Sequence, residues 1–188
     1  MAFFFIFSGV ILRLIPHLPN FAPIAAIALF GGVYLPAGRH GLNKKYAIIV
    51  PIIAMLIGDY FIGFYNPWVL ISVYGSFLSI GLIGLWLRNH KSMLNIIGAS
   101  LFGSIVFFLV TNFSMWAIPH SLYPHNLQGL LNCYTMGLPF FRNTILGDLF
   151  YVGVMFSLME IVIKITNSWE LRRKEHGYAF ERIDRKGL

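Results

Sequence analysis

Charged residues are scarce in this sequence, and cysteine is almost missing. Charged side chains make up 11% of the 188 residues, whereas soluble domains carry roughly 25%. The single cysteine, Cys133, excludes an intrachain disulfide and a multi-cysteine zinc or iron–sulfur site. The sequence also lacks the Gly-x-Ser-x-Gly and His-Glu-x-x-His motifs and a phosphate-binding loop. We therefore expect neither an enzyme nor a protein with a resident cofactor.

Long apolar runs take the place of the missing charges. Hydrophobic residues form 57% of the chain, and a run of ~20 apolar residues can cross a bilayer core about 30 Å thick. The sequence therefore predicts an all-α integral membrane fold over 1–166, followed by a basic cytoplasmic tail over 167–188. The six predicted transmembrane helices cover 2–15, 21–36, 46–64, 67–87, 93–118 and 143–166.

The positions of the basic residues predict an orientation. Eleven of the fourteen Lys and Arg residues lie after the second and fourth apolar segments and in the tail. The other gaps contain only Arg13 and Arg142. Because cytoplasmic loops are enriched in Lys and Arg, we expect both termini in the cytoplasm. The basic residues that give the net charge of +7 flank apolar spans. This position favours contact with the lipid bilayer over nucleic acid binding.

Four ionisable residues are predicted near the outer membrane boundary: Arg13, Asp59, Arg142 and Asp148. Charges at membrane depth are costly, so they pair with one another or face a cavity. Two interpretations follow. The two arginines neutralise the two carboxylates, or the four residues contact a polar ligand. The two are compatible, because a paired network can line a pocket.

The outward gaps also repeat one pattern, an asparagine close to an aromatic residue. Interfacial anchoring accounts for many membrane aromatics, but it gives the amides no role. A pocket for a ligand with a flat apolar body and a hydrogen-bonding edge accounts for both. The predicted substrate-binding residues, besides the four ionisable ones, are His17, Asn20, Phe21, Tyr65, Trp68, Asn112, Trp116, Tyr134 and Asn143.

Histidines on the outer side raise the question of a metal. His17, His120, His125 and Cys133 all fall there, but their spacings match no metal-binding signature. We therefore predict no dedicated metal site. A metal-ion transporter is kept as an alternative, with His120, His125 and Cys133 as its candidate ligands.

Three outer strings together resemble a family of small bacterial membrane proteins of unassigned function. The strings run from Arg13 to Pro23, from Ile57 to Tyr65 and from Cys133 to Asp148. This family is similar in architecture to the S components of energy-coupling factor (ECF) vitamin transporters. The resemblance implies a six-helix bundle in the bacterial cytoplasmic (inner) membrane that takes up a vitamin or similar small molecule through an outward-facing pocket.

The solitary cobalamin-type S components look nearest, so cobalamin is the first candidate substrate. In that group a cysteine can bind the cobalt, and Cys133 is the candidate here. S components dock a coupling subunit, which works with ATPases, through small residues on one helix. The resemblance places that role on Ala22 and Ala26. The alternative of another class is a membrane scaffold or accessory subunit that binds a partner protein.

Overall fold

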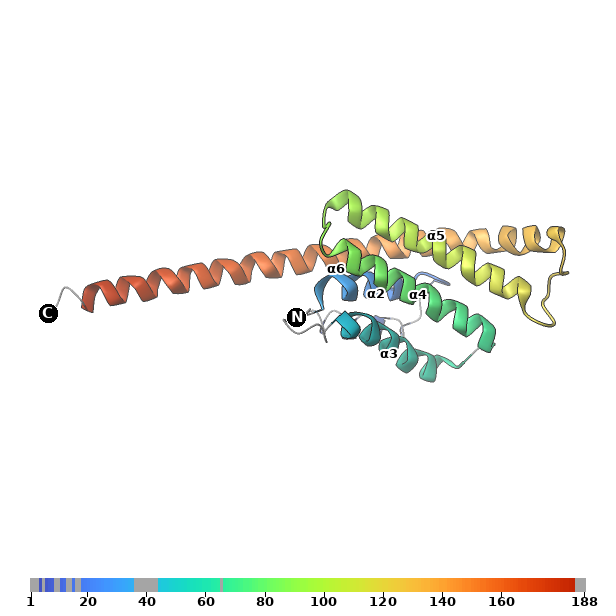
Figure 1. Ribbon diagram of the computed structural model, residues 1–188, viewed down its shortest axis with the longest axis horizontal. Helices are drawn as coiled ribbons and strands as arrows, with labels where there is room; N and C mark the ends of the chain where they lie inside the picture. The colour runs from blue at the N-terminus through green and yellow to red at the C-terminus, as the bar shows by residue number, and fades with distance from the viewer. Residues whose placement is uncertain are drawn as a thin grey trace. The chain divides into compact units, whose positions relative to one another are not determined.

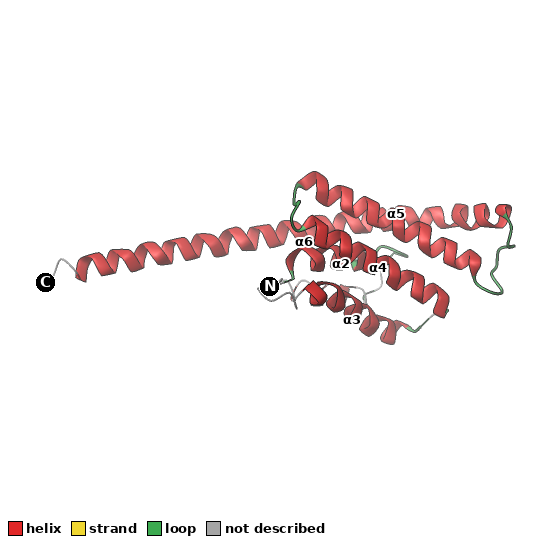
Figure 2. Ribbon diagram, in the orientation of Figure 1, coloured by secondary structure: helices red, strands yellow, loops and turns green. Residues whose placement is uncertain are grey.

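A computed structural model describes residues 4, 6–8, 11–12, 15, 18–35, 44–64 and 66–184, and gives the backbone alone for 44–48, 50, 51, 54, 62 and 174–184. Within these ranges all regular secondary structure is helical (Figures 1 and 2). The predicted all-α class is confirmed for this part of the chain. The longer helices are α2 (Ile24–Tyr34), α3 (Lys44–Ile62), α4 (Pro67–Leu87), α5 (Met93–Ala117) and α6 (Leu127–Asp184).

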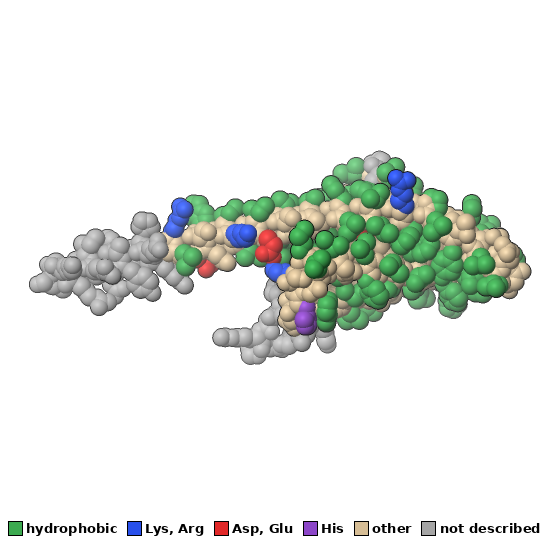
Figure 3. All heavy atoms as spheres, turned by 90° about the horizontal axis from the view of Figure 1, so that it is seen from above, with side chains coloured by type: hydrophobic (Ala, Val, Ile, Leu, Met, Phe, Trp, Pro, Cys, Tyr) green, Lys and Arg blue, Asp and Glu red, His purple; other side chains and the backbone are tan. Residues whose placement is uncertain are grey.

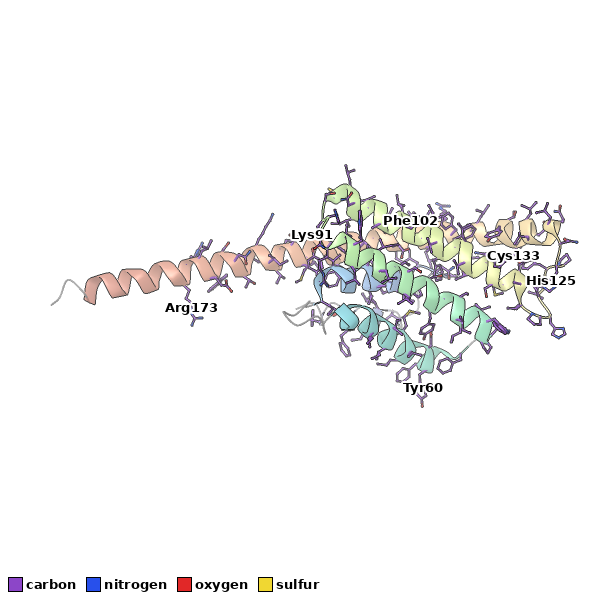
Figure 4. All side chains as sticks on the ribbon, viewed as in Figure 1. Tyr60, Lys91, Phe102, His125, Cys133 and Arg173 are labelled. Atoms are coloured by element: carbon purple, nitrogen blue, oxygen red, sulfur yellow. The ribbon has the colours of Figure 1, made fainter. Side chains whose placement is uncertain are left out.

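The chain divides into two compact units. The first, Met1–Met155, contains α2 to α5 and the first part of α6, and we call it the bundle unit. The second, Phe156–Leu188, contains the rest of α6. Its described side chains include exposed Trp169 and Arg173, the latter labelled in Figure 4.

Three of the described helices are long and apolar enough to cross a membrane: Pro67–Leu87, Met93–Ala117 and the Leu127–Arg173 part of α6. Many of their apolar side chains point away from the protein, as for Leu94 and Phe102. Apolar side chains cover much of the face of the bundle unit that Figure 3 shows. Exposed apolar surface of this extent is stable in contact with lipid, not water. The three long apolar helices and this surface together indicate a membrane protein.

Helix α2 forms the centre of the bundle unit. Its sequence has no polar face, and nine of its eleven residues, Ala25 to Val33, are buried. It packs against α3, α4 and α5, and α4 also packs against α3 and α5 (Figure 1). A helix that is apolar all round belongs in such an interior. With eleven residues it is shorter than a full membrane span.

Glycines let α2 and α4 approach closely. A Cβ atom at Gly32 would lie 2.6 Å from the carbonyl oxygen of Gly81, and one at Gly84 would lie 2.5 Å from that of Leu29. Any larger residue would push the two backbones apart. Small residues at helix crossings are typical of membrane bundles, in which van der Waals contact drives association.

Arg88 holds the C-terminal end of α2. Its guanidinium group donates to the carbonyl oxygens of Gly32, Val33 and Leu35, with Nη2 2.7 Å from the first and the last. The last carbonyls of a helix have no partner within the helix, and a cation is favourable there. Nearby, the Nζ atom of Lys91 lies 5.1 Å from the ring centroid of Tyr34 (Lys91 in Figure 4).

Helix α6 begins earlier than predicted. The last predicted segment begins at Asn143 and leaves the stretch up to Arg142 as a long outer gap, but α6 is helical from Leu127. Asn126 caps the new start, since its Oδ1 accepts from the Gly129 N–H at 2.8 Å. Glycines and Pro139 inside the helix obscured it in the sequence. Membrane helices tolerate such residues because neighbouring groups satisfy the backbone.

Candidate functional site

A pocket of about 250 Å³ lies inside the bundle unit, between the turn before α2, the start of α4, the second half of α5 and the first part of α6. A second pocket of about 70 Å³ shares Asn20, Phe107 and Thr144 with it and reaches Asp148. The larger pocket is lined by Asn20, Val69, Phe107, Phe108, Thr111, Asn112, Met115, Gly137, Phe140, Phe141 and Thr144.

Helical periodicity places the lining residues of α6 on one face. Four of them follow one another at intervals of three or four residues: Gly137, Phe141, Thr144 and Asp148. They therefore form one stripe along the helix. Lining residues of α5 repeat in the same way, as Phe108, Asn112 and Met115 do. The aromatic rings of Phe108 and Phe141 stack between the two helices, with their centroids 4.4 Å apart.

Asp148 is the buried acidic residue of this site. Its side chain is 3% exposed, and its Oδ2 accepts a 2.7 Å hydrogen bond from the Ser104 hydroxyl group. Ser104 is itself fully buried on α5. The predicted neutralisation by Arg142 is not seen: Arg142 is exposed, and no ion pair joins the two within the described residues. Arg13 lies outside the described residues.

Asp59 occupies a different place in the bundle unit. It is fully buried on α3, and its Oδ2 accepts a 2.6 Å hydrogen bond from the Tyr74 hydroxyl group of α4. It lines neither pocket. The structure therefore separates the two carboxylates that the sequence grouped as one outer set.

Three predicted substrate-binding residues, Asn20, Asn112 and Asp148, line the pockets. Asn143 supports the site from outside, because its Nδ2 donates at 3.0 Å to the carbonyl oxygen of Pro19 in the turn before α2. Asn20 in that turn has a positive φ of 63°, which asparagine tolerates better than most residues. His17 and Tyr65 lie outside the described residues.

The other predicted aromatic residues have structural contacts. Phe21 packs against Phe150 and Tyr151, and the Tyr134 hydroxyl group donates to the carbonyl oxygen of Leu109 at 2.9 Å. Trp116 donates through Nε1 to the carbonyl oxygen of Pro124 at 3.0 Å. Trp68 is exposed and lines an open groove between α4 and α5. None of these four is a lining residue of the two pockets.

The candidate metal ligands do not form a cluster within the described residues. Within the described residues no group of three or more His, Cys, Asp or Glu side chains could hold a metal ion. His125 meets the Trp116 ring edge to face, and His120 sits in the loop before it. Cys133 is 2% exposed, and its Sγ donates to the carbonyl oxygen of Asn112 at 3.3 Å (His125 and Cys133 in Figure 4).

Of the two alanines assigned to partner docking, Ala22 lies in the turn before α2 and Ala26 lies in the first turn of α2. Ala26 has no exposed surface within the bundle unit, and Ala22 is half-buried and lines the smaller pocket. Other helices of the same chain cover this face. Docking of a coupling subunit at these residues stays a prediction.

Sequence reasoning missed the apolar walls of the pocket. The four phenylalanines come as two pairs, Phe107–Phe108 and Phe140–Phe141, and nothing in composition marks them as different from lipid-facing residues. The sequence did carry one signal of these walls, the helical spacing of the residues. Once 127–142 is treated as helix, Phe141 falls on the stripe that carries Asp148.

No curated protein and no solved structure matches the chain significantly. A family model does: the one described as "Family of unknown function (DUF6580)" covers residues 1–170. This range contains the whole bundle unit and both pockets. The chain belongs to the DUF6580 family of unknown function.

Proposed function

We propose that this chain is the substrate-binding membrane subunit of an uptake system for a small organic molecule. In this proposal it has six spans with both termini in the cytoplasm, and its pocket opens outward, as in the S components of ECF transporters. A coupling subunit and ATPases would supply the energy. The mode of action is supported by the similarity in architecture between S components and the family that the outer strings resemble. The pocket supports the binding of a solute.

The observation that carries the proposal is a polar pocket inside an apolar bundle. The larger pocket is lined by Thr111, Asn112 and Thr144 together with phenylalanines, and the adjoining smaller pocket by Thr144 and Asp148. A buried ionisable residue within a membrane helix is costly and marks functional sites in membrane proteins. A bundle that served as a scaffold alone would have no need to place these groups around a space.

The size of the pocket favours a ligand smaller than cobalamin. The two volumes, about 250 and 70 Å³, each lie below the range of about 300–1,000 Å³ for drug-sized ligands. A corrin ring with its nucleotide loop exceeds that size. Cys133, the candidate cobalt ligand, is buried against the backbone of α5 and lines neither pocket. A vitamin-like molecule of one or two rings suits this space.

Mass spectrometry of the purified chain tests the proposal. The full chain, extracted in mild detergent and washed, should release a small molecule on denaturation. The amount should fall roughly tenfold in Asn112→Ala, since a lost hydrogen bond in a dry site costs about 1–2 kcal/mol. Asn132→Ala is the matched control, because Asn132 is exposed on α6 and bonds only to Gln128 within the described residues.

Two results would contradict the proposal. One is a parent protein that carries no small molecule and instead co-purifies with a protein partner in stoichiometric amount, as a scaffold would. The other is a bound molecule whose amount is the same in Asn112→Ala, Asn132→Ala and the parent, which would place its site elsewhere.

A further inference from the structure

The threonine hydroxyl groups in the pocket wall already use their hydrogen atoms. Thr111 Oγ1 donates to the carbonyl oxygen of Phe107 at 2.7 Å, and Thr144 Oγ1 donates to that of Phe140 at 3.0 Å. Each hydroxyl group has one hydrogen but two lone pairs. Because the hydrogen points back to the helix, each threonine presents only acceptor capacity to the pocket.

The Asn112 side chain is also oriented so that it offers an acceptor. Its Nδ2 donates to the carbonyl oxygen of Phe108 at 2.8 Å, which fixes which end of the amide is nitrogen. Its Oδ1 faces α6 at Gly137, where an added Cβ atom would come within 2.5 Å of it. No described group donates to this oxygen. The amide thus adds another acceptor to the wall, and the absence of a side chain at Gly137 leaves room for this oxygen.

The charged side chain in the wall also favours a ligand that donates hydrogen bonds. Asp148 is acidic, and the Ser104 hydroxyl group is its hydrogen-bond partner within the described residues. The lining residues of the two pockets include no Lys, Arg or His. A carboxylate at this depth is stabilised most by a cation. A ligand can supply that cation.

The apolar part of the wall accommodates such a ligand. Phe107, Phe108, Phe140 and Phe141 surround the larger pocket. Aromatic rings bind flat apolar groups, and their faces also attract cations. The wall therefore combines aromatic surfaces, acceptor oxygens and one carboxylate.

From this arrangement we propose that the pocket selects a protonated primary or secondary amine attached to an aromatic or apolar body. The ammonium group lies toward Asp148 and donates to the oxygens of Thr111, Thr144 and Asn112, while the body lies among the phenylalanines. This inference rests on the proposed function, whose ligand class it names. It disfavours an anionic substrate, which would meet the like charge of Asp148 and two threonine hydroxyl groups that can only accept.

Four compounds with the same phenyl-ethyl body test this selection: 2-phenylethylamine, phenethyltrimethylammonium, 2-phenylethanol and 3-phenylpropanoate. Binding is measured by calorimetry on the full chain in detergent. We expect the primary ammonium to bind at least tenfold more tightly than the alcohol and the carboxylate. It should also bind more tightly than the trimethylammonium, which has no N–H to donate.

Substitutions at the carboxylate locate the selection. Asp148→Asn should remove the preference of the ammonium over the alcohol, and Asp148→Glu should keep it. Asp59→Asn is the matched control, since it neutralises a carboxylate that lines neither pocket, and it should keep the preference. If Asp148→Asn does not fold, Thr144→Val serves instead. It removes one acceptor and should weaken ammonium binding several-fold while leaving alcohol binding unchanged.

The inference is overturned if 3-phenylpropanoate or 2-phenylethanol binds as tightly as 2-phenylethylamine, or if the preference survives in Asp148→Asn. It is also overturned if none of the four binds and the molecule that co-purifies with the chain carries no amine. In that last case the proposed function stands and only the ligand class is wrong. If no compound binds and nothing co-purifies, both proposals fail.

Discussion

At the scale of single residues, the pair of Asp148 and Ser104 separates this protein from an inert membrane helix bundle. Both side chains are buried, and the hydroxyl group donates to the carboxylate at 2.7 Å. One turn earlier on α5, Ser100 is also buried, yet its Oγ has no hydrogen-bond partner among the described residues. Two serines four residues apart therefore have opposite energetic roles.

This contrast gives a prediction for stability. Ser104→Ala should lower the free energy of unfolding by about 1.5–3 kcal/mol, the usual range for a hydrogen bond to a charged group. Ser100→Ala should leave it unchanged or raise it, because the substitution removes a polar atom that burial leaves unsatisfied. Thermal unfolding of the purified variants in one detergent measures both. Equal losses in the two variants would mean that the Ser104–Asp148 bond contributes nothing.

At the scale of elements, α2 is held at both of its ends and along its length. The Nδ2 of Asn143 fixes the turn before it, Arg88 caps its last carbonyls, and glycines bring it into contact with α4. In the sequence Arg88 is one of the eleven basic residues that predict the orientation, and nothing there points to its role as a cap. Its three backbone acceptors could not be anticipated, since more than fifty residues separate them from it.

The glycine crossing can be tested with one substitution at two positions of α4. Gly84→Ala should lower the free energy of unfolding by about 1–3 kcal/mol, since the new Cβ overlaps the Leu29 carbonyl group. Gly75→Ala adds the same methyl group where nothing lies within 4 Å. It should be neutral or stabilise the helix by about 0.5–1 kcal/mol. Thermal unfolding of both variants checks this, and similar shifts for the two would argue against the close crossing.

At the scale of the whole molecule, the predicted topology calls for a direct measurement. The bundle unit places the loop before α6 and the loop before α5 at opposite ends of α5. Leu122, in the loop before α6, is 91% exposed. Met93, where the loop before α5 meets that helix, is 78% exposed. Both positions can react with a thiol reagent if they face the compartment that contains it.

Single-cysteine variants should then label from opposite sides. In a Cys133→Ala background, Leu122→Cys should react with a membrane-impermeant maleimide added to intact cells. Met93→Cys should react only after the membrane is permeabilised. This follows from the excess of Lys and Arg in the loop before α5 and in the tail. The reverse labelling pattern would invert the orientation and place the pocket on the cytoplasmic side.

The sequence by itself determined the membrane class and the positions of the clearest helices. The predicted segments 67–87 and 93–118 agree with α4 and α5 almost to the residue, because a long apolar run bounded by polar residues is a local property. The start of α6 depended instead on the Asn126 cap and on neighbours that tolerate Pro139 and the glycines. The pocket depended on the tertiary structure too. Stripes on α5 and α6, together with Asn20, become a pocket only when the helices pack. Packing is decided by contacts between residues far apart in the chain, which no single segment contains.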